Sequence, residues 1–128
     1  PLFLAQAALP WLRESQGCIV NIIDIHAIRP LKNHPVYGAA KAGLSFLTKA
    51  LARDLAPQVR VNGVAPGAVL WPDGGISEAT KEVVLRQIPL HRTGEPTDIA
   101  GCILYLVRDA TYVTGQVIAV DGGRSAGW

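Results

Sequence analysis

Tyr37 and Lys41 are the two residues whose types and spacing most directly suggest chemistry. They are separated by Gly38-Ala39-Ala40, and on a helix this i,i+4 spacing places both side chains on one face, with about 6 Å between their Cβ atoms. A free tyrosine has a pKa of about 10, and a nearby ammonium group favours the phenolate. We therefore expect Lys41 to lower the pKa of Tyr37, which would let the tyrosine give or take a proton while a hydride moves.

Asp24 is the third candidate, and it comes thirteen residues before Tyr37. It directly follows an apolar, β-branched run over 18–23, which predicts a strand buried on both faces. In a parallel sheet, ligands bind at the carboxyl ends of the strands. Asp24 is therefore expected at the edge of the sheet where chemistry takes place.

The elements that must position these residues alternate between strands and helices. The patterns predict helices over 2–14, 35–56, 77–87 and 96–108, strands over 18–23, 59–64 and 116–120, and turns or loops over 24–33, 65–67, 68–75 and 121–123. This alternation is typical of an α/β protein with a doubly wound parallel sheet. The three strand ends lie at Asp24, at Pro66-Gly67 and at Asp121-Gly122, and the last of these is interpreted as a structural turn.

The composition limits the classes of protein to which the chain can belong. The chain has 128 residues, a formal net charge of +2, 49% hydrophobic and 17% charged residues, which fits one domain and excludes disordered or collagenous chains. The two cysteines, Cys18 and Cys102, have no spacing typical of a disulfide framework or a metal site. We expect a protein of a reducing compartment, the cytoplasm, that binds neither nucleic acid nor membrane and holds no metal.

The chain contains no methionine and begins at Pro1 within an apolar run. We therefore expect it to be a fragment, a processed chain or the ordered part of something longer. The Gly-rich turn that cradles a dinucleotide pyrophosphate is also absent from the sequence. The 128 residues alone are thus predicted not to bind a dinucleotide cofactor tightly.

Together the motifs resemble the C-terminal half of the short-chain dehydrogenase/reductase family, over essentially the whole chain. The segments that carry the resemblance are Gly17-Cys18-Ile19-Val20-Asn21-Ile22, Tyr37-Gly38-Ala39-Ala40-Lys41-Ala42-Gly43, Val59-Arg60-Val61-Asn62 with Pro66-Gly67, Arg92-Thr93-Gly94-Glu95-Pro96, and Val113-Thr114-Gly115-Gln116 through Val120-Asp121-Gly122-Gly123. The resemblance implies that 1–128 is the catalytic C-terminal half of one Rossmann-type reductase domain, without its N-terminal dinucleotide-binding half. It also implies a homo-oligomer, a tetramer, formed in part through the helices over 2–14 and 35–56.

Within that family the chain is most similar to the pteridine reductase branch, because Asp24 stands where serine is usual. This implies NADPH-dependent reduction of a dihydropterin or dihydrofolate. Tyr37 would be the acid, Lys41 would lower its pKa and bind the nicotinamide ribose, and Asp24 would assist proton delivery. Ile23, Pro66, Gly67 and Val69 would contact the cofactor together with Tyr37 and Lys41, while Asp24, Tyr37 and Trp71 would contact the substrate.

Other interpretations stay open. Asp24 could be an ordinary loop acid, in which case the chain is a carbonyl-reducing relative, such as a 3-oxoacyl thioester reductase. The chain could also be a non-catalytic module for oligomerisation. Pro66-Gly67 fits a plain turn equally well, Trp71 could pack locally, and for His26 and Arg29 a solvated loop is favoured over substrate contact.

Overall fold

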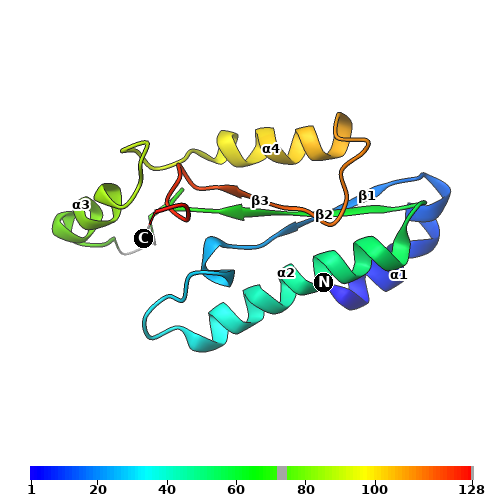
Figure 1. Cartoon of the computed structure of the whole chain (residues 1–128), viewed down its shortest axis with the longest axis horizontal. Helices are drawn as coiled ribbons and strands as arrows, with labels where there is room; N and C mark the ends of the chain where they lie inside the picture. Colours follow the sequence, from blue (N-terminus) through cyan, green and yellow to red (C-terminus); the bar gives the residue numbers. More distant parts are fainter. Residues whose placement is uncertain (72–74, 128) are drawn as a thin grey trace.

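A three-stranded parallel sheet forms the centre of the molecule in the computed structural model, which describes residues 1–71 and 75–127. The strands β1 (Cys18–Ile22), β2 (Arg60–Pro66) and β3 (Val117–Val120) lie in the order β1-β2-β3 (Figure 1). Cys18 is opposite Arg60 and Gly63 is opposite Val117. The predicted α/β fold with parallel strands is therefore confirmed.

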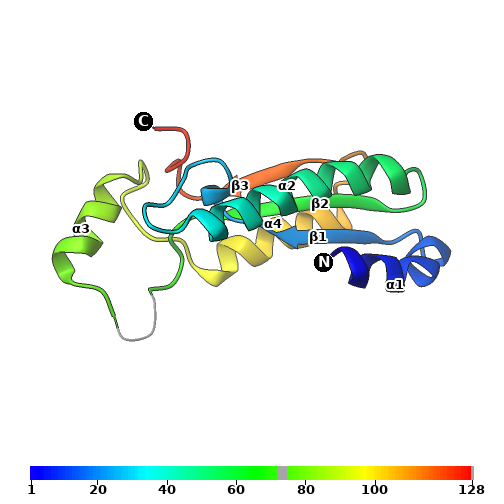
Figure 2. The ribbon, with the colours of Figure 1, turned by 90° about the horizontal axis from the view of Figure 1, so that it is seen from below.

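Helices cover both faces of this sheet. Figures 1 and 2 show α1 (Leu2–Glu14) and α2 (Pro35–Leu55) on one face and α4 (Pro96–Arg108) on the other. The short helix α3 (Glu78–Arg86) lies at the end of the molecule where the strands terminate, close to the C-terminal segment (Figure 1). This arrangement leaves the carboxyl edge of the sheet bordered by loops and short elements, as a ligand-binding edge requires.

The buried centre of the core is β2, where Val61 and Val64 have no exposed surface. Asn62, on the same strand, is 1% exposed; its Nδ2 donates to the carbonyl of Val113 at 2.8 Å, and its Oδ1 accepts from the backbone N–H of Gln116 at 3.0 Å. A buried amide is tolerated only when it is hydrogen-bonded. Asn62 therefore ties the loop before β3 to the central strand.

The helix α2, which carries Tyr37 and Lys41, is fixed to β1 by a polar contact. The Nδ2 of Asn21 donates to the Oγ1 of Thr48 at 2.9 Å, and Thr48 is fully buried. Pro35 occupies the first turn of the helix, where a proline's missing N–H costs no hydrogen bond. The predicted helix over 35–56 is thus present, and its N-terminal turns reach the carboxyl edge of the sheet.

Three local features differ from the sequence-based expectations. Residues Ile25–Ala27 form a 3-10 helix, η1, within the predicted loop. β2 continues through Pro66, because Ala65 and Pro66 pair with Ala119 and Val120 rather than forming a turn. β1 is only partly buried, and Ile22 is 46% exposed, because the sheet order leaves one side of β1 without a partner strand in the described part of the chain.

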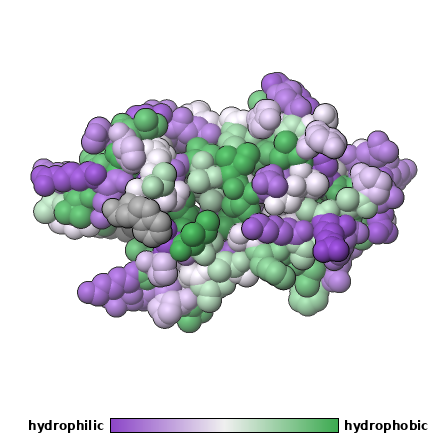
Figure 3. Space-filling model, viewed as in Figure 1, coloured by the Kyte–Doolittle hydropathy of each residue, from purple (hydrophilic) through white to green (hydrophobic). Residues whose placement is uncertain are grey.

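The surface combines apolar and charged regions. Hydrophobic side chains gather towards the middle of the face in Figure 3, while hydrophilic ones are prominent at both ends. None of the helices in the described part of the chain is long and apolar enough to cross a membrane.

Candidate active site

Asp24 and Tyr37 are in direct contact at the carboxyl edge of the sheet. Asp24 follows β1 and caps η1: its Oδ1 accepts from the backbone N–H of His26 at 2.8 Å. Its Oδ2 accepts a hydrogen bond from the hydroxyl of Tyr37 at 2.6 Å. Because each carboxyl oxygen has its own donor, the side chain of Asp24 is held in one orientation against the phenol.

Lys41 lies one helical turn further along α2. Its Nζ donates to the carbonyl of Ile22, the last residue of β1, at 3.0 Å and lies 5.8 Å from the centre of the Tyr37 ring. An ammonium group has three N–H donors, so two remain for other partners. The structure thus brings Asp24, Tyr37 and Lys41 together, as the sequence predicts.

The pKa of Tyr37 differs from the expected direction. Burial, the hydrogen bond to Asp24 and the negative charge of Asp24 raise the pKa of Tyr37 to about 12. All three favour the neutral phenol, and Lys41, 5.8 Å from the ring centre, does not reverse them. The expectation that Lys41 lowers this pKa is therefore wrong for the structure, in which Tyr37 keeps its proton at neutral pH and can act as a proton donor.

The residues expected to contact a cofactor lie along the ends of β1 and β2. Ile23 is 2% exposed and packs in the core with Ile25 and Ala65, so only its backbone can face a ligand. Pro66 ends β2 opposite Val120. These positions border the same edge as Lys41, which has two unused N–H donors for the hydroxyl groups of a nucleotide ribose.

Gly67 has a structural reason to be glycine. A Cβ at this position would lie 2.7 Å from the Cα of Asp121, and its backbone N–H donates to the carbonyl of Val120 at 3.0 Å. The close approach is therefore to the end of β3. The loop continues through Val69, which is partly buried and would be 3.4 Å from a Cβ added at Gly94. Trp71 is also partly buried on this loop, and its contact with substrate stays a prediction.

Asp121 belongs to the turn after β3. Its two carboxyl oxygens accept from the backbone N–H groups of Gly123 at 2.9 Å and Ser125 at 2.6 Å. Partial burial acts to raise the pKa of Asp121, but the hydrogen bonds from Ser125 and Gly123 outweigh it and lower the pKa. The carboxylate thus stabilises the turn, in agreement with its interpretation as structural.

Three arginines near this edge were not identified as a group from the sequence. Arg29, Arg86 and Arg124 line one cavity of about 670 Å³, which is also lined by Ile25 and His26 of η1. Only Arg29 was a candidate from the sequence, because the three arginines belong to segments far apart in the chain. The position of Arg124, directly after the turn that ends β3, was the one available signal. In the described part of the chain, no group of three or more His, Cys, Asp or Glu could hold a metal ion.

Comparisons with known proteins agree with this geometry. The protein family described as Enoyl-(Acyl carrier protein) reductase matches residues 1–125. The chain is 40% identical over 124 residues to a 3-oxoacyl-(acyl-carrier-protein) reductase of Thermotoga maritima, covering 94% of this chain and 50% of that protein. It is 39% identical over 127 residues to a 7alpha-hydroxysteroid dehydrogenase of Bacteroides fragilis, covering 95% of this chain and 49% of that protein.

A solved structure of a short-chain dehydrogenase/reductase from Brucella melitensis superposes with a TM-score of 0.79 at 37% identity, covering 85% of this chain and 45% of that one. The chain therefore spans about half the length of the proteins that it matches.

Proposed function

Because the chain belongs to the short-chain dehydrogenase/reductase family, we propose that it carries the proton-transfer residues of an NAD(P)H-dependent reductase. The observation that carries this proposal is the 2.6 Å hydrogen bond from Tyr37 to Asp24, with Lys41 beside the same ring. Tyr37 is the proton donor, because its raised pKa keeps the phenol protonated. Asp24 orients this hydroxyl by accepting its hydrogen bond and would assist proton delivery through Tyr37.

NADPH is the proposed cofactor, and when bound it would supply the hydride. Lys41 would hold its ribose hydroxyls through the two N–H donors that Ile22 does not use. The backbone of Ile23 and the loop from Pro66 to Val69 border the place where the nicotinamide would lie. The intact arrangement of Asp24, Tyr37 and Lys41 favours an enzyme over a non-catalytic module for oligomerisation.

Two substrate classes remain candidates, each with its own support. The names of the relatives support reduction of a carbonyl group, because they include a 3-oxoacyl-(acyl-carrier-protein) reductase and a hydroxysteroid dehydrogenase. In a carbonyl reductase of this family, Tyr37 would protonate the developing alkoxide oxygen as the hydride arrives at carbon.

The second candidate is a dihydropterin or dihydrofolate, and the side chain of Asp24 favours it. Reduction of a C=N bond places a hydride on carbon and requires a proton on nitrogen. A carboxyl group that accepts hydrogen bonds can also bind the donor-rich ring of a pterin. Asp24, oriented by His26 and hydrogen-bonded to Tyr37, would bind the ring and hold the Tyr37 hydroxyl that supplies the proton.

The substitution Asp24→Ser separates the two candidates. If the substrate is a pterin, the variant loses turnover of dihydrobiopterin and retains turnover of a panel of ketones; loss of ketone reduction with retained pterin reduction would refute the pterin assignment. Tyr37→Phe should lower both activities by about 10²–10⁴-fold, the usual contribution of a general acid. Asp109→Ser is a matched control, since this exposed carboxylate pairs with Arg108 away from the site.

A homo-oligomer is the proposed assembly. Large apolar side chains project from α1 and α2 into solvent: Phe3 is 83%, Trp11 69% and Phe46 75% exposed. Exposed apolar patches of this kind mark interaction surfaces, and the family resemblance implies a tetramer. Sedimentation of the wild type against Phe46→Glu would test it, with a shift to smaller species expected for the variant and unchanged sedimentation as the contrary result.

A further inference from the structure

The arginine cavity is lined by Arg29, Arg86 and Arg124, together with His26 and Gln87. The charged residues in its lining are all positive. Its volume of about 670 Å³ is within the range of small-molecule sites. None of its lining residues in the described part of the chain is acidic. Three of its lining residues are arginines, which do not lose their proton in proteins, and one of them, Arg86, has an acidic neighbour, Glu82, outside the lining.

The walls of the cavity are joined by hydrogen bonds between segments distant in sequence. The Nη1 of Arg29 donates to the carbonyl of Arg124, and the Nη2 of Arg124 donates to the Oε1 of Gln87 at 2.9 Å. On the η1 side, a ring nitrogen of His26 lies 2.8 Å from the carbonyl oxygen of Arg29. The residues after β1, at the end of α3 and after β3 therefore form one framework.

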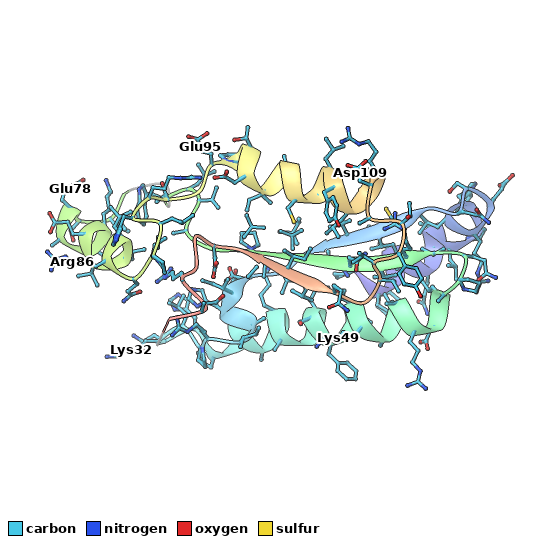
Figure 4. All side chains as sticks on the ribbon, turned by 45° about the horizontal axis from the view of Figure 1, so that its top comes forward. Lys32, Lys49, Glu78, Arg86, Glu95 and Asp109 are labelled. Carbon is cyan, nitrogen blue, oxygen red and sulfur yellow. The ribbon has the colours of Figure 1, made fainter. Side chains whose placement is uncertain are left out.

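Most of the N–H donors of these arginines are not used by the protein. A guanidinium has five N–H donors, and in the described part of the chain the side chains of Arg29 and Arg124 each make one hydrogen bond. Arg86 lies at the end of α3 (Figure 4), and among the described residues its side chain forms one polar contact, an exposed ion pair with Glu82 at 3.6 Å. Such a pair contributes little to stability. Little free energy is therefore lost if Arg86 leaves Glu82 to bind an anion in the cavity.

We propose that the arginine cavity binds a carboxylate or phosphate group at the distal end of the substrate, and so selects for substrates with an anionic tail. The assignment rests on the proposed reductase function, because it treats the anion as part of the molecule that is reduced. Guanidinium groups match carboxylate and phosphate oxygens with paired, charge-assisted hydrogen bonds. Two substrate types carry such groups: a pterin with a glutamate tail, and a thioester on a phosphopantetheine arm.

The cavity borders the residues that hold the proton donor. The backbone N–H of His26, a lining residue, donates to the same Asp24 carboxyl that binds the Tyr37 hydroxyl. Two residues span at most about 7 Å of chain. The wall of the cavity formed by His26 therefore lies next to the Asp24–Tyr37 pair.

The proposal can be tested by binding, without turnover. We would titrate the full chain with 4-aminobenzoyl-glutamate, with pantetheine 4′-phosphate and with the neutral probes 4-aminobenzamide and pantetheine. Calorimetry should show binding of at least one anionic probe with a Kd in the millimolar range or tighter, weakened by added salt, and weaker binding of its neutral counterpart. The anionic probe that binds identifies the source of the anion.

The variant Arg86→Gln should weaken that binding about tenfold, the effect of one lost charged hydrogen bond. Arg86 is exposed, so the substitution leaves the fold intact, which a melting curve verifies. Arg53→Gln is the matched control: it removes the same charge from an exposed arginine in the last turn of α2, at the opposite end of the helix from Tyr37. Equal affinity in wild type, Arg86→Gln and Arg53→Gln, or equal binding of neutral and anionic probes, would overturn the proposal.

Kinetics then connect the cavity to the substrate. For Arg86→Gln we expect the KM of dihydrofolate, which has two carboxylates, to rise about tenfold, with little change in kcat or in the KM of dihydrobiopterin. Equal effects on both substrates would refute selection by the tail. Absence of turnover with both pterins in wild-type protein that is shown to bind NADPH would refute the pterin chemistry, and the probe titrations would still decide whether the anion site exists.

Discussion

Replacing Asp24 with serine should lower the pKa of Tyr37, which stands at about 12 in the structure. Of the three causes that raise this pKa, burial is the largest and stays in the variant, whereas the hydrogen bond to a carboxylate and its negative charge are lost. The new pKa should therefore lie between the ordinary value of about 10 and the native value. At about pH 11, a phenol of pKa about 12 is roughly one-tenth ionised, and one of pKa about 10 is roughly nine-tenths ionised.

The ionisation can be followed by NMR of protein with ¹³C-labelled tyrosine, in which each ring carbon next to the hydroxyl shifts as its phenol loses a proton. The chain has three tyrosines, and the variant Tyr37→Phe identifies the signal of Tyr37 by its disappearance. Circular dichroism over the same pH range verifies that the protein stays folded. Asp24→Asn adds a useful intermediate, because an amide oxygen keeps the hydrogen bond while the charge is removed.

The result that would refute the reasoning is an unchanged or higher pKa of Tyr37 in Asp24→Ser. It would mean that the Asp24 carboxyl does not accept the phenol hydrogen bond in solution. A pKa equal in Asp24→Asn and wild type, with a lower value in Asp24→Ser, would assign the effect to the hydrogen bond rather than to the charge.

Three further predictions concern the scaffold that positions the site. Asn62→Leu should destabilise the protein by about 1–3 kcal/mol in urea unfolding, since the two hydrogen bonds that this buried amide makes to the backbone are lost; a loss below the error of the measurement would contradict this. Gly67→Ala should cost about 1–3 kcal/mol because its Cβ would lie 2.7 Å from Asp121, whereas Gly43→Ala, where a Cβ meets nothing within 4 Å, should not destabilise. Asp121 has a lowered pKa in the folded protein. Its contribution to the free energy of unfolding should therefore be present above the unfolded-state pKa of about 3.9 and lost as the pH falls through the pKa of the folded state. The difference in unfolding free energy between wild type and Asp121→Asn should accordingly shrink in acid, and a constant difference would argue against it.

Local patterns were sufficient to predict most of the fold. The i,i+4 spacing of Tyr37 and Lys41, with Pro35 in the first turn, predicted a helix that presents both residues at the sheet edge, and α2 does so. Asp24 was expected at the carboxyl edge of the sheet because it follows a parallel strand, and the family resemblance implied that it acts together with Tyr37, which it contacts.

Properties set by distant neighbours were not predictable in this way. The direction of the Tyr37 pKa depends on how closely Asp24 approaches and how much water is excluded, neither of which spacing provides. The arginine cavity depends on three segments meeting in space, so no local pattern around Arg86 or Arg124 identified it.

The position of β1 at the side of the sheet has a consequence for amide hydrogen exchange. Gly17 and Ile23 bond to β2 through their backbone, and N–H groups alternate in direction along a strand. The amides of Cys18, Val20 and Ile22 therefore point away from β2, while those of Ile19 and Asn21 point towards it. One strand thus contains two interleaved sets of amides, one protected by the sheet and one open to deuterium. If a further strand pairs with β1, the open set slows as a unit, and these three amides report directly on that pairing.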